Sequence, residues 1–283
     1  MASHTVKEPQ KRLDQYVTEQ FQDLSRASAS KLIAGGKVKV NKEVQLKSGY
    51  KLRPKDKIKV DYKPDEQPPI PKIKLKVLYE DDDCVVIEKP VGLLTHSKGV
   101  FNPEPTVETW LHDRVSGLEG ERAGIVHRLD RATSGVMICA KNSETLHKLQ
   151  KQFSLRKVKK SYTAIVQGTF ELPEAIIDMP IERHPKKPQT FRVGNNGKDA
   201  LTRYKVLKAN DTCSLIELRP TTGRTHQIRV HMAHIKHPIL GDSLYNGLVA
   251  DRLYLHAHTL EITIPSGERK TFISKVPKDF TLK

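Results

Sequence analysis

The sequence predicts an α+β protein with a large domain on a mixed, largely antiparallel sheet and a smaller α/β domain before it. Two observations support this. The 283 residues fit two unequal domains, and four prolines within 62–75 indicate a linker between them. After this linker, strand-like segments outnumber helical ones and do not alternate regularly with them. We therefore expect domains at 11–63 and 75–282, joined by a proline-rich linker at 64–74.

Two helices are predicted before the linker. Three apolar residues of the first helix fall on one helical face: Leu13, Tyr16 and Val17. Ser25 or Ser28 is suited to begin the second helix, which should end at the glycine pair 35–36. Lysine then alternates with valine or isoleucine in 37–45 and 56–62, as in half-buried strands with a basic outer face.

The large domain begins with strand-like segments and contains one clear helix. The helix should start near Asn142, because Leu146, Leu149 and Phe153 recur three and four residues apart. A short strand is expected at 76–79, followed by an acidic turn at 80–83, and further strands are expected at 84–87, 136–140, 161–166, 201–207, 215–218 and 259–264.

Charge favours a polyanionic partner, of which nucleic acid is the commonest. Lys and Arg number 49 against 33 Asp and Glu, which gives a net charge of +16. Residues 1–63 alone hold 15 basic and 7 acidic side chains. A merely solvated surface and an anionic membrane surface are the alternatives, but no basic amphipathic helix supports the second.

Several function classes lack sequence support. No segment has the apolar length of a membrane span or a signal peptide, so a cytoplasmic location is expected. Three scattered cysteines cannot form paired zinc-binding motifs or a disulfide framework. No nucleotide-binding glycine motif, nucleophile elbow or zinc protease motif occurs. We expect neither metal nor cofactor.

The segment 127–135, HRLDRATSG, is chemically dense. It places Asp130 among His127, Arg128 and Arg131, directly before a predicted strand. Such a carboxylate should be ionised, and it is suited to act as nucleophile, base or metal ligand, or simply as half of an ion pair. On spacing alone the structural ion pair is favoured.

A second dense segment covers 221–242. Thr225 is suited to cap a helix whose buried face is Ile228, Met232 and Ile235. This spacing places Arg229 beside the buried face, where it could reach a carboxylate or a phosphate. The four histidines at 226, 231, 234 and 237 suggest zinc, but thiolate partners are lacking, so structural or RNA-facing roles are favoured.

A third segment, 156–168, has four cations just before Tyr162 at the start of a strand. A tyrosine there is normally a packing residue whose hydroxyl finds a hydrogen-bond partner. Its basic neighbours make contact with an RNA backbone the alternative.

These segments together resemble the RluA-type pseudouridine synthases. The resemblance runs in order through EDDDCVVIEKPVGLLTH, HRLDRATSGVMICAK, KKSY, GKDALTRYKVL, TGRTHQIRVH with HPILGD, and LYLHA. It covers 75–282. Residues 12–63 resemble the S-four-type RNA-binding domain through RLDQYV, LSRASASKLIAGGKVKVN and DKIKV.

The resemblance implies isomerisation of uridine in RNA to pseudouridine, without a cofactor or metal. It implies that Asp130 is the catalytic carboxylate, either by covalent addition or as a base. Tyr162 would pack on the base, Arg229 would pair with the aspartate, Leu255 would line the uracil pocket, and Arg128 would enter the RNA. Further RNA contacts are expected from basic residues of both domains: Arg26, Lys31, Lys37, Lys39, Lys160 and Arg224.

The expected substrate is structured RNA. The resemblance to a second RNA-binding domain favours ribosomal RNA, most of all that of the large subunit, with transfer RNA as the alternative. A catalytically inactive RNA-binding or ribosome-assembly factor is the competing hypothesis, and we expect a monomer.

Overall fold

A computed structural model describes residues 2–5, 11–21, 24–63, 70–96, 104–115, 118 and 124–282. Its contacts divide the chain into two units. The first contains the described residues up to Lys72 together with Glu104 and Pro105, and the second contains the other described residues from Ile73 onward. Most of the predicted linker, 64–69, lies outside the described residues.

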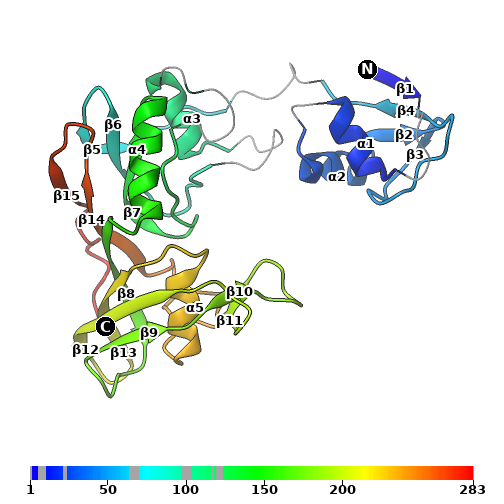
Figure 1. Cartoon of the computed structure of the whole chain (residues 1–283). Helices are drawn as coiled ribbons and strands as arrows, with labels where there is room; N and C mark the ends of the chain where they lie inside the picture. Colours follow the sequence, from blue (N-terminus) through cyan, green and yellow to red (C-terminus); the bar gives the residue numbers. More distant parts are fainter. Residues whose placement is uncertain are drawn as a thin grey trace. The chain divides into compact units, whose positions relative to one another are not determined.

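The first unit packs two helices against a four-stranded antiparallel sheet (Figure 1). Its elements are α1 (Leu13–Gln20), α2 (Arg26–Ala34), β1 (Ala2–Thr5), β2 (Val38–Val40), β3 (Glu43–Val44) and β4 (Lys57–Val60), with the strand order β1-β4-β2-β3. Leu13, Tyr16 and Val17 are buried in its core, as their spacing predicts. Ser25, rather than Ser28, caps α2, because its hydroxyl accepts a hydrogen bond from the Ser28 amide.

The prediction of a single strand over 37–45 is wrong. The segment forms a hairpin, in which β2 and β3 flank Asn41 and Lys42. Both turn residues have positive φ angles, 52° and 75°, as a two-residue hairpin turn of the mirror-image type requires. The lysines of β2 and β4 face outward while valine and isoleucine face the core.

The second unit contains a nine-stranded sheet with the order β5-β6-β7-β14-β8-β13-β12-β9, and β15 pairs with β14. Its strands are β5 (Lys76–Glu80), β6 (Cys84–Lys89), β7 (Ser134–Ala140), β8 (Lys159–Gln167), β9 (Glu174–Asp178), β12 (Leu201–Ala209), β13 (Cys213–Pro220), β14 (Leu255–Thr263) and β15 (Arg269–Ile273). All described pairings in it are antiparallel except that of β7 with β14. The predicted fold class is confirmed.

Gly135 permits the parallel contact between β7 and β14. Its φ is +122°, and a Cβ at this position would lie 2.2 Å from the carbonyl oxygen of Ala257. No residue with a side chain fits so close to a neighbouring backbone. The strand after the dense segment 127–135 therefore reaches β14 only because this residue is glycine.

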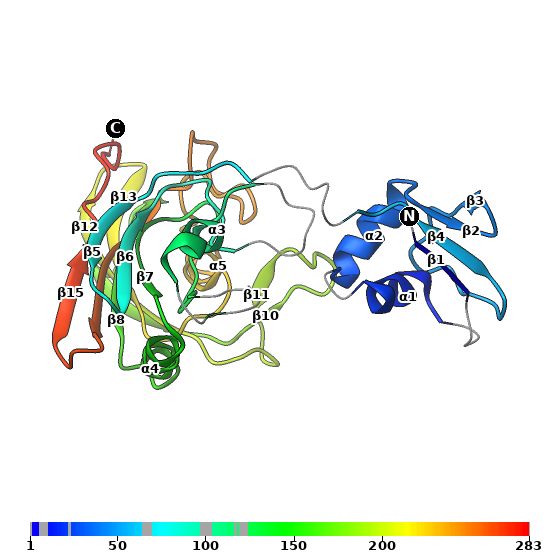
Figure 2. The same ribbon diagram turned by 90° about the horizontal axis from the view of Figure 1, so that it is seen from above.

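Two apolar cores lie along this sheet, and different helices pack against each of them. The first core contains β5, β6 and β7 with α3 (Val107–Leu111) and α4 (Ser143–Ser154). The second contains β8, β12 and β13 with α5 (Gln227–His234). Figure 1 shows α4 beside β7 and α5 beside β13, and Figure 2 shows β5, β6 and β7 next to one another.

Several short elements carry no clear sequence signal. They are β9, β15, α3, the 3₁₀ turn after it (His112–Arg114) and the hairpin of β10 (Ile181–Arg183) with β11 (Phe191–Val193). The α4 helix begins where predicted, because the side chain of Asn142 accepts a hydrogen bond from the Thr145 amide. Among the described helices none has the length and apolarity needed to cross a bilayer.

Candidate active site

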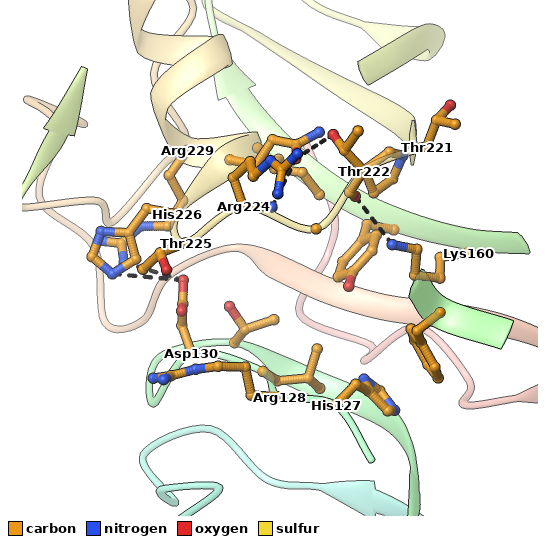
Figure 3. Close-up of a pocket in the computed structure, with 18 of the residues that line it drawn as sticks. His127, Arg128, Asp130, Lys160, Thr221, Thr222, Arg224, Thr225, His226 and Arg229 are labelled. Carbon is orange, nitrogen blue, oxygen red and sulfur yellow. Dashed lines mark hydrogen bonds and ion pairs between the residues drawn. The ribbon is translucent and has the colours of Figure 1, made fainter. Parts of the chain in front are cut away.

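A cavity of about 470 Å³ opens in the second unit (Figure 3). Its walls come from the loop 127–133, from the end of α4 with Arg156, from β8, from the loop 220–226 with the start of α5, and from Leu255 at the start of β14. This volume is typical of a site for a small molecule or a single nucleotide. The cavity thus joins the dense segments that the sequence singled out.

The lining of the cavity is strongly cationic. Asp130 is the one acidic residue among the described residues that line it. Five cationic side chains share the lining: Arg128, Arg156, Lys160, Arg224 and Arg229. Burial lowers the pKa of His127 to about 3, so this histidine adds no charge at neutral pH. The cavity is therefore suited to an anionic ligand.

The loop that carries Asp130 is held by the segment that follows β6. The hydroxyl of Thr95 donates to the Leu129 carbonyl at 2.8 Å and accepts from the Leu129 amide at 3.2 Å. The Gly92 amide donates to the Arg131 carbonyl at 2.8 Å. Bonds on both sides of Asp130 fix its backbone, which is how a reacting group is kept in one geometry.

Lys89 is fully buried beneath this loop. Its ammonium donates to the carbonyls of Pro90 at 3.0 Å and Leu93 at 2.8 Å, and lies 3.4 Å from that of Arg131. Burial lowers the pKa of Lys89 to about 7, while the charge of Asp130 acts in the opposite direction. The sequence alone does not indicate a role for Lys89, because a lysine at the end of a strand is normally exposed.

Arg229 is buried, which contradicts its predicted place beside the buried face. It is 6% exposed, and its guanidinium donates to both oxygens of Asp242, at 2.7 Å each. Its Nη1 lies 3.5 Å from Oδ2 of Asp130. Burial acts to lower the pKa of Arg229, but Asp242 and then Asp130 raise it, so the cation persists.

Asp242 is the residue that periodicity missed. It is 1% exposed and follows Gly241, whose φ of +79° and close approach to the Arg252 carbonyl exclude a side chain. An arginine on a helix can be buried only when a carboxylate from another segment pairs with its guanidinium. The spacing within 221–235 alone does not show that partner.

The predicted cap at Thr225 is wrong. The helix α5 begins at Gln227, and the residue before it, His226, has a left-handed backbone with φ 57°. The Gln227 side chain instead closes the turn, because its carbonyl oxygen accepts from the Arg224 amide at 3.0 Å and the Thr222 hydroxyl at 2.7 Å.

His226 faces the carboxylate (Figure 3). Its Nε2 lies 3.9 Å from Oδ2 of Asp130, and its Nδ1 lies 2.8 Å from the hydroxyl of Tyr245. Burial lowers the pKa of His226, and the nearby Asp130 acts against that shift. The ring is therefore neutral at pH 7.

Alternation along β8 places Lys160 and Tyr162 on one face. Leu255 pairs with Ala164, so it is the diagonal neighbour of Tyr162. Burial, and to a lesser extent Asp130, raise the pKa of Tyr162, so its hydroxyl stays protonated. The Lys160 ammonium donates to the Thr222 carbonyl at 3.1 Å, and burial lowers its pKa to about 8.

The remaining histidines of the second dense segment make structural contacts or lie outside the site. His231 bonds the Thr202 hydroxyl and the Met179 carbonyl. His237 bonds the Gln167 carbonyl and stacks on Phe170. Within the described ranges, no group of three or more His, Cys, Asp or Glu side chains could hold a metal ion.

Comparison with known families identifies the chain. The family model described as RNA pseudouridylate synthase matches residues 83–234, and that of the S4 domain matches 11–58. The chain belongs to the RluA-type RNA pseudouridine synthases. It is an isomerase that acts on RNA and carries an S-four-type RNA-binding domain at its N-terminal side.

Two relatives of this pseudouridine synthase show how far the similarity extends. The ribosomal large subunit pseudouridine synthase D of Borreliella burgdorferi is 37% identical over 295 residues, covering 98% of this chain and 90% of the relative. An uncharacterized RNA pseudouridine synthase of Aquifex aeolicus is 40% identical over 253 residues, covering 85% and 78%. Both relatives match along most of their length.

A solved structure supports the fold of the synthase. Human RNA pseudouridylate synthase domain containing 1 is 27% identical, with a TM-score of 0.60, and the similarity covers 74% of this chain and 85% of that one. The four basic residues predicted in the S-four-type domain belong to the first unit and are not among the residues that line the cavity: Arg26, Lys31, Lys37 and Lys39. All four are exposed, although Arg26 pairs with Asp14 and Lys37 with Asp61.

Proposed function

We propose that this pseudouridine synthase modifies uridines of large-subunit ribosomal RNA in the cytoplasm, with Asp130 as its catalytic carboxylate. The observation that carries the proposal is a single carboxylate in a cavity whose other charged side chains are all cationic. The names of relatives such as the Borreliella burgdorferi protein support the choice of RNA. Transfer RNA is the alternative substrate.

Isomerisation requires a cavity that keeps the detached uracil in place. The base must leave the ribose, turn and reattach through carbon, so a partly apolar wall and few competing polar groups are needed. We assign the wall to Leu255 and the stacking surface to Tyr162, whose raised pKa keeps its hydroxyl neutral. A neutral phenol stacks on uracil without adding charge to the cavity.

Arg229 is assigned to orienting Asp130. A guanidinium already held by two 2.7 Å bonds to Asp242 is fixed before the substrate arrives. It therefore presents its third nitrogen to Asp130 without further loss of side-chain entropy. An arginine stays charged at every physiological pH, so the carboxylate keeps its partner.

The cationic lining is assigned to the nucleotide phosphates and to base flipping. Extruding a uridine from its stack costs on the order of a few kcal/mol. Contacts of Lys160 and Arg224 with phosphates offset that cost, and Arg128, which is exposed beside Asp130, fills the space that the uridine leaves. The basic residues of the first unit add a second contact with RNA: Arg26, Lys31, Lys37 and Lys39.

The experiment that tests the substrate is carbodiimide mapping of pseudouridines in total RNA from cells with and without the gene. We expect one or more sites in large-subunit ribosomal RNA to disappear. Restoring the gene should restore them, and restoring it with Asp130→Asn should not. Loss of a site only in transfer RNA would overturn the substrate, and restoration by the variant would overturn the role of Asp130.

A further inference from the structure

His226 is held in a backbone conformation that costs free energy. Its φ of 57° and ψ of 17° are left-handed, a conformation that is unfavourable for a residue with a side chain. It sits where glycine or asparagine would relieve this cost, and its side chain does not cap its own helix. Such strain persists where the surrounding structure fixes the residue, and it is concentrated at functional sites.

The imidazole is oriented from several directions. Its Nδ1 lies 2.8 Å from the Tyr245 hydroxyl, and the Phe191 amide donates to that same hydroxyl at 3.0 Å. The rings of Phe191 and Tyr245 both meet the imidazole edge-on, with centroids 5.6 Å and 5.7 Å away. The ring therefore has one orientation, with Nε2 toward Asp130 (Figure 3).

These contacts determine which ring nitrogen carries the proton. The Tyr245 oxygen already accepts from the Phe191 amide, so its own hydrogen is available to donate to Nδ1 of His226. Nδ1 then accepts, and Nε2 carries the hydrogen. The opposite tautomer would direct a lone pair of Nε2 at the Asp130 carboxylate, which is unfavourable. The other charged groups around the ring are Arg229, Asp242 and Arg128.

We propose that His226 is a positioning residue that holds Oδ2 of Asp130 through a hydrogen-bond chain from Phe191 and Tyr245. Arg229 and His226 approach the same carboxylate oxygen, at 3.5 Å and 3.9 Å. With Oδ2 engaged on that side, Oδ1 is the oxygen that meets the nucleotide. A contact of 3.9 Å exceeds a hydrogen bond, but such contacts shorten when a substrate closes the site.

The chain also connects the β10–β11 hairpin to the reacting carboxylate. Phe191 begins β11, and Tyr245 follows Asp242 in the turn that holds Arg229. The guanidinium of Arg229 lies 5.1 Å from the centre of the Tyr245 ring. Tyr245 therefore contacts both groups that approach Oδ2. Although Tyr245 does not line the cavity, removing its hydroxyl should change how Asp130 is positioned.

The test compares single-turnover rates of pseudouridine formation on total RNA purified from cells that lack the gene. This inference rests on the proposed role of Asp130, so Asp130→Asn is measured alongside. We expect His226→Leu to lower the rate on the order of a hundredfold and His226→Gln, which keeps a donor, to remain within about threefold of wild type. Tyr245→Phe should lower the rate about tenfold. Tyr254→Phe removes a hydroxyl that bonds Asp251 outside the cavity and should change nothing.

RNA affinity should stay within about twofold in all of these variants, since none removes a phosphate contact. Nitrogen NMR of labelled histidine should show His226 protonated at Nε2 in the wild type. Protonation at Nδ1, or a wild-type rate in His226→Leu with an inactive Asp130→Asn, would overturn the inference. An active Asp130→Asn would instead overturn the proposed function. If His226→Leu does not fold, the Tyr245→Phe rate and the NMR signal decide.

Discussion

Arg229 binds Asp242 with two hydrogen bonds of 2.7 Å and reaches Asp130 at 3.5 Å. The two carboxylates therefore interact with the same guanidinium at different distances. Asp242 is fully enclosed and shares a bidentate bond, whereas the Asp130 side chain is 19% exposed and faces the cavity. This asymmetry separates Asp242, which is the structural partner of the arginine, from Asp130, for which we propose the catalytic role.

Substituting Arg229 should affect both stability and turnover. Arg229→Ala leaves Asp242 buried without its partner, so the free energy of unfolding should fall by about 3–5 kcal/mol. Pseudouridine formation should fall steeply, with RNA affinity much less affected. Denaturant unfolding and single-turnover kinetics measure the two effects. Arg229→Lys keeps the charge without the bidentate geometry and should remain defective; wild-type turnover in either variant would remove Arg229 from the site.

Asp130→Asn should separate catalysis from folding. The amide is nearly isosteric with the carboxylate, and Arg229 keeps both bonds to Asp242, so thermal stability and RNA binding should stay close to wild type. Pseudouridine formation should be abolished. A variant that unfolds would indicate that Asp130 serves an ion pair that stabilises the fold, as the spacing of 127–135 alone favours.

Lys160 should make RNA affinity depend on pH. Because its pKa is about 8 in the protein without RNA, the Lys160 ammonium is mostly charged below pH 8 and mostly deprotonated above pH 8. A phosphate contact by Lys160 is therefore strongest at pH 7 and weaker at pH 9. The affinity ratio between wild type and Lys160→Met should shrink over this range. Lys160→Arg, whose charge does not titrate here, should not show this loss, and parallel profiles for all three would contradict the contact.

Deleting residues 1–63 should weaken RNA binding and leave the chemistry intact. The first unit has its own buried core, and Asp130, Tyr162 and Arg229 all belong to the second. For every phosphate that the shortened protein no longer neutralises, the slope of log affinity against log salt should become shallower by roughly 0.7–0.9. Turnover of a short oligonucleotide in excess should survive. An unchanged slope would show that this basic segment does not touch RNA.

Gly135→Ala should be severely destabilising because its Cβ would enter the backbone of β14, 2.2 Å from the Ala257 oxygen. The expected loss is about 3 kcal/mol or more in denaturant unfolding. Gly267→Ala is the matched control, because that glycine also has positive φ, +90°, but has open space around its Cβ. It should lose only about 1 kcal/mol. Equal losses would mean that backbone strain, not the close approach, determines the cost.

Sequence reasoning predicted the fold better than the internal geometry of the site. The periodic spacing of apolar residues predicts the main strands of both cores and the buried face of α4, because such spacing arises when one side of an element is buried. They could not identify Asp242 or Tyr245, whose importance comes from segments that meet only in the folded chain. The same limit explains Arg229: its burial depends on a partner thirteen positions away. The sequence does not show where α5 begins, because Gln227, within the helix, closes the turn that a cap normally closes.

The parallel pairing of β7 with β14 joins residues that are far apart along the chain, Ser134 with His256. During synthesis on the ribosome, domains fold in order from the N-terminal end as they emerge. Most of the RNA-binding unit is synthesised before residue 73, whereas Leu255 and the strand β14 that begins with it are synthesised more than 180 residues later. A nascent chain therefore gains the ability to hold RNA long before it gains the ability to change it.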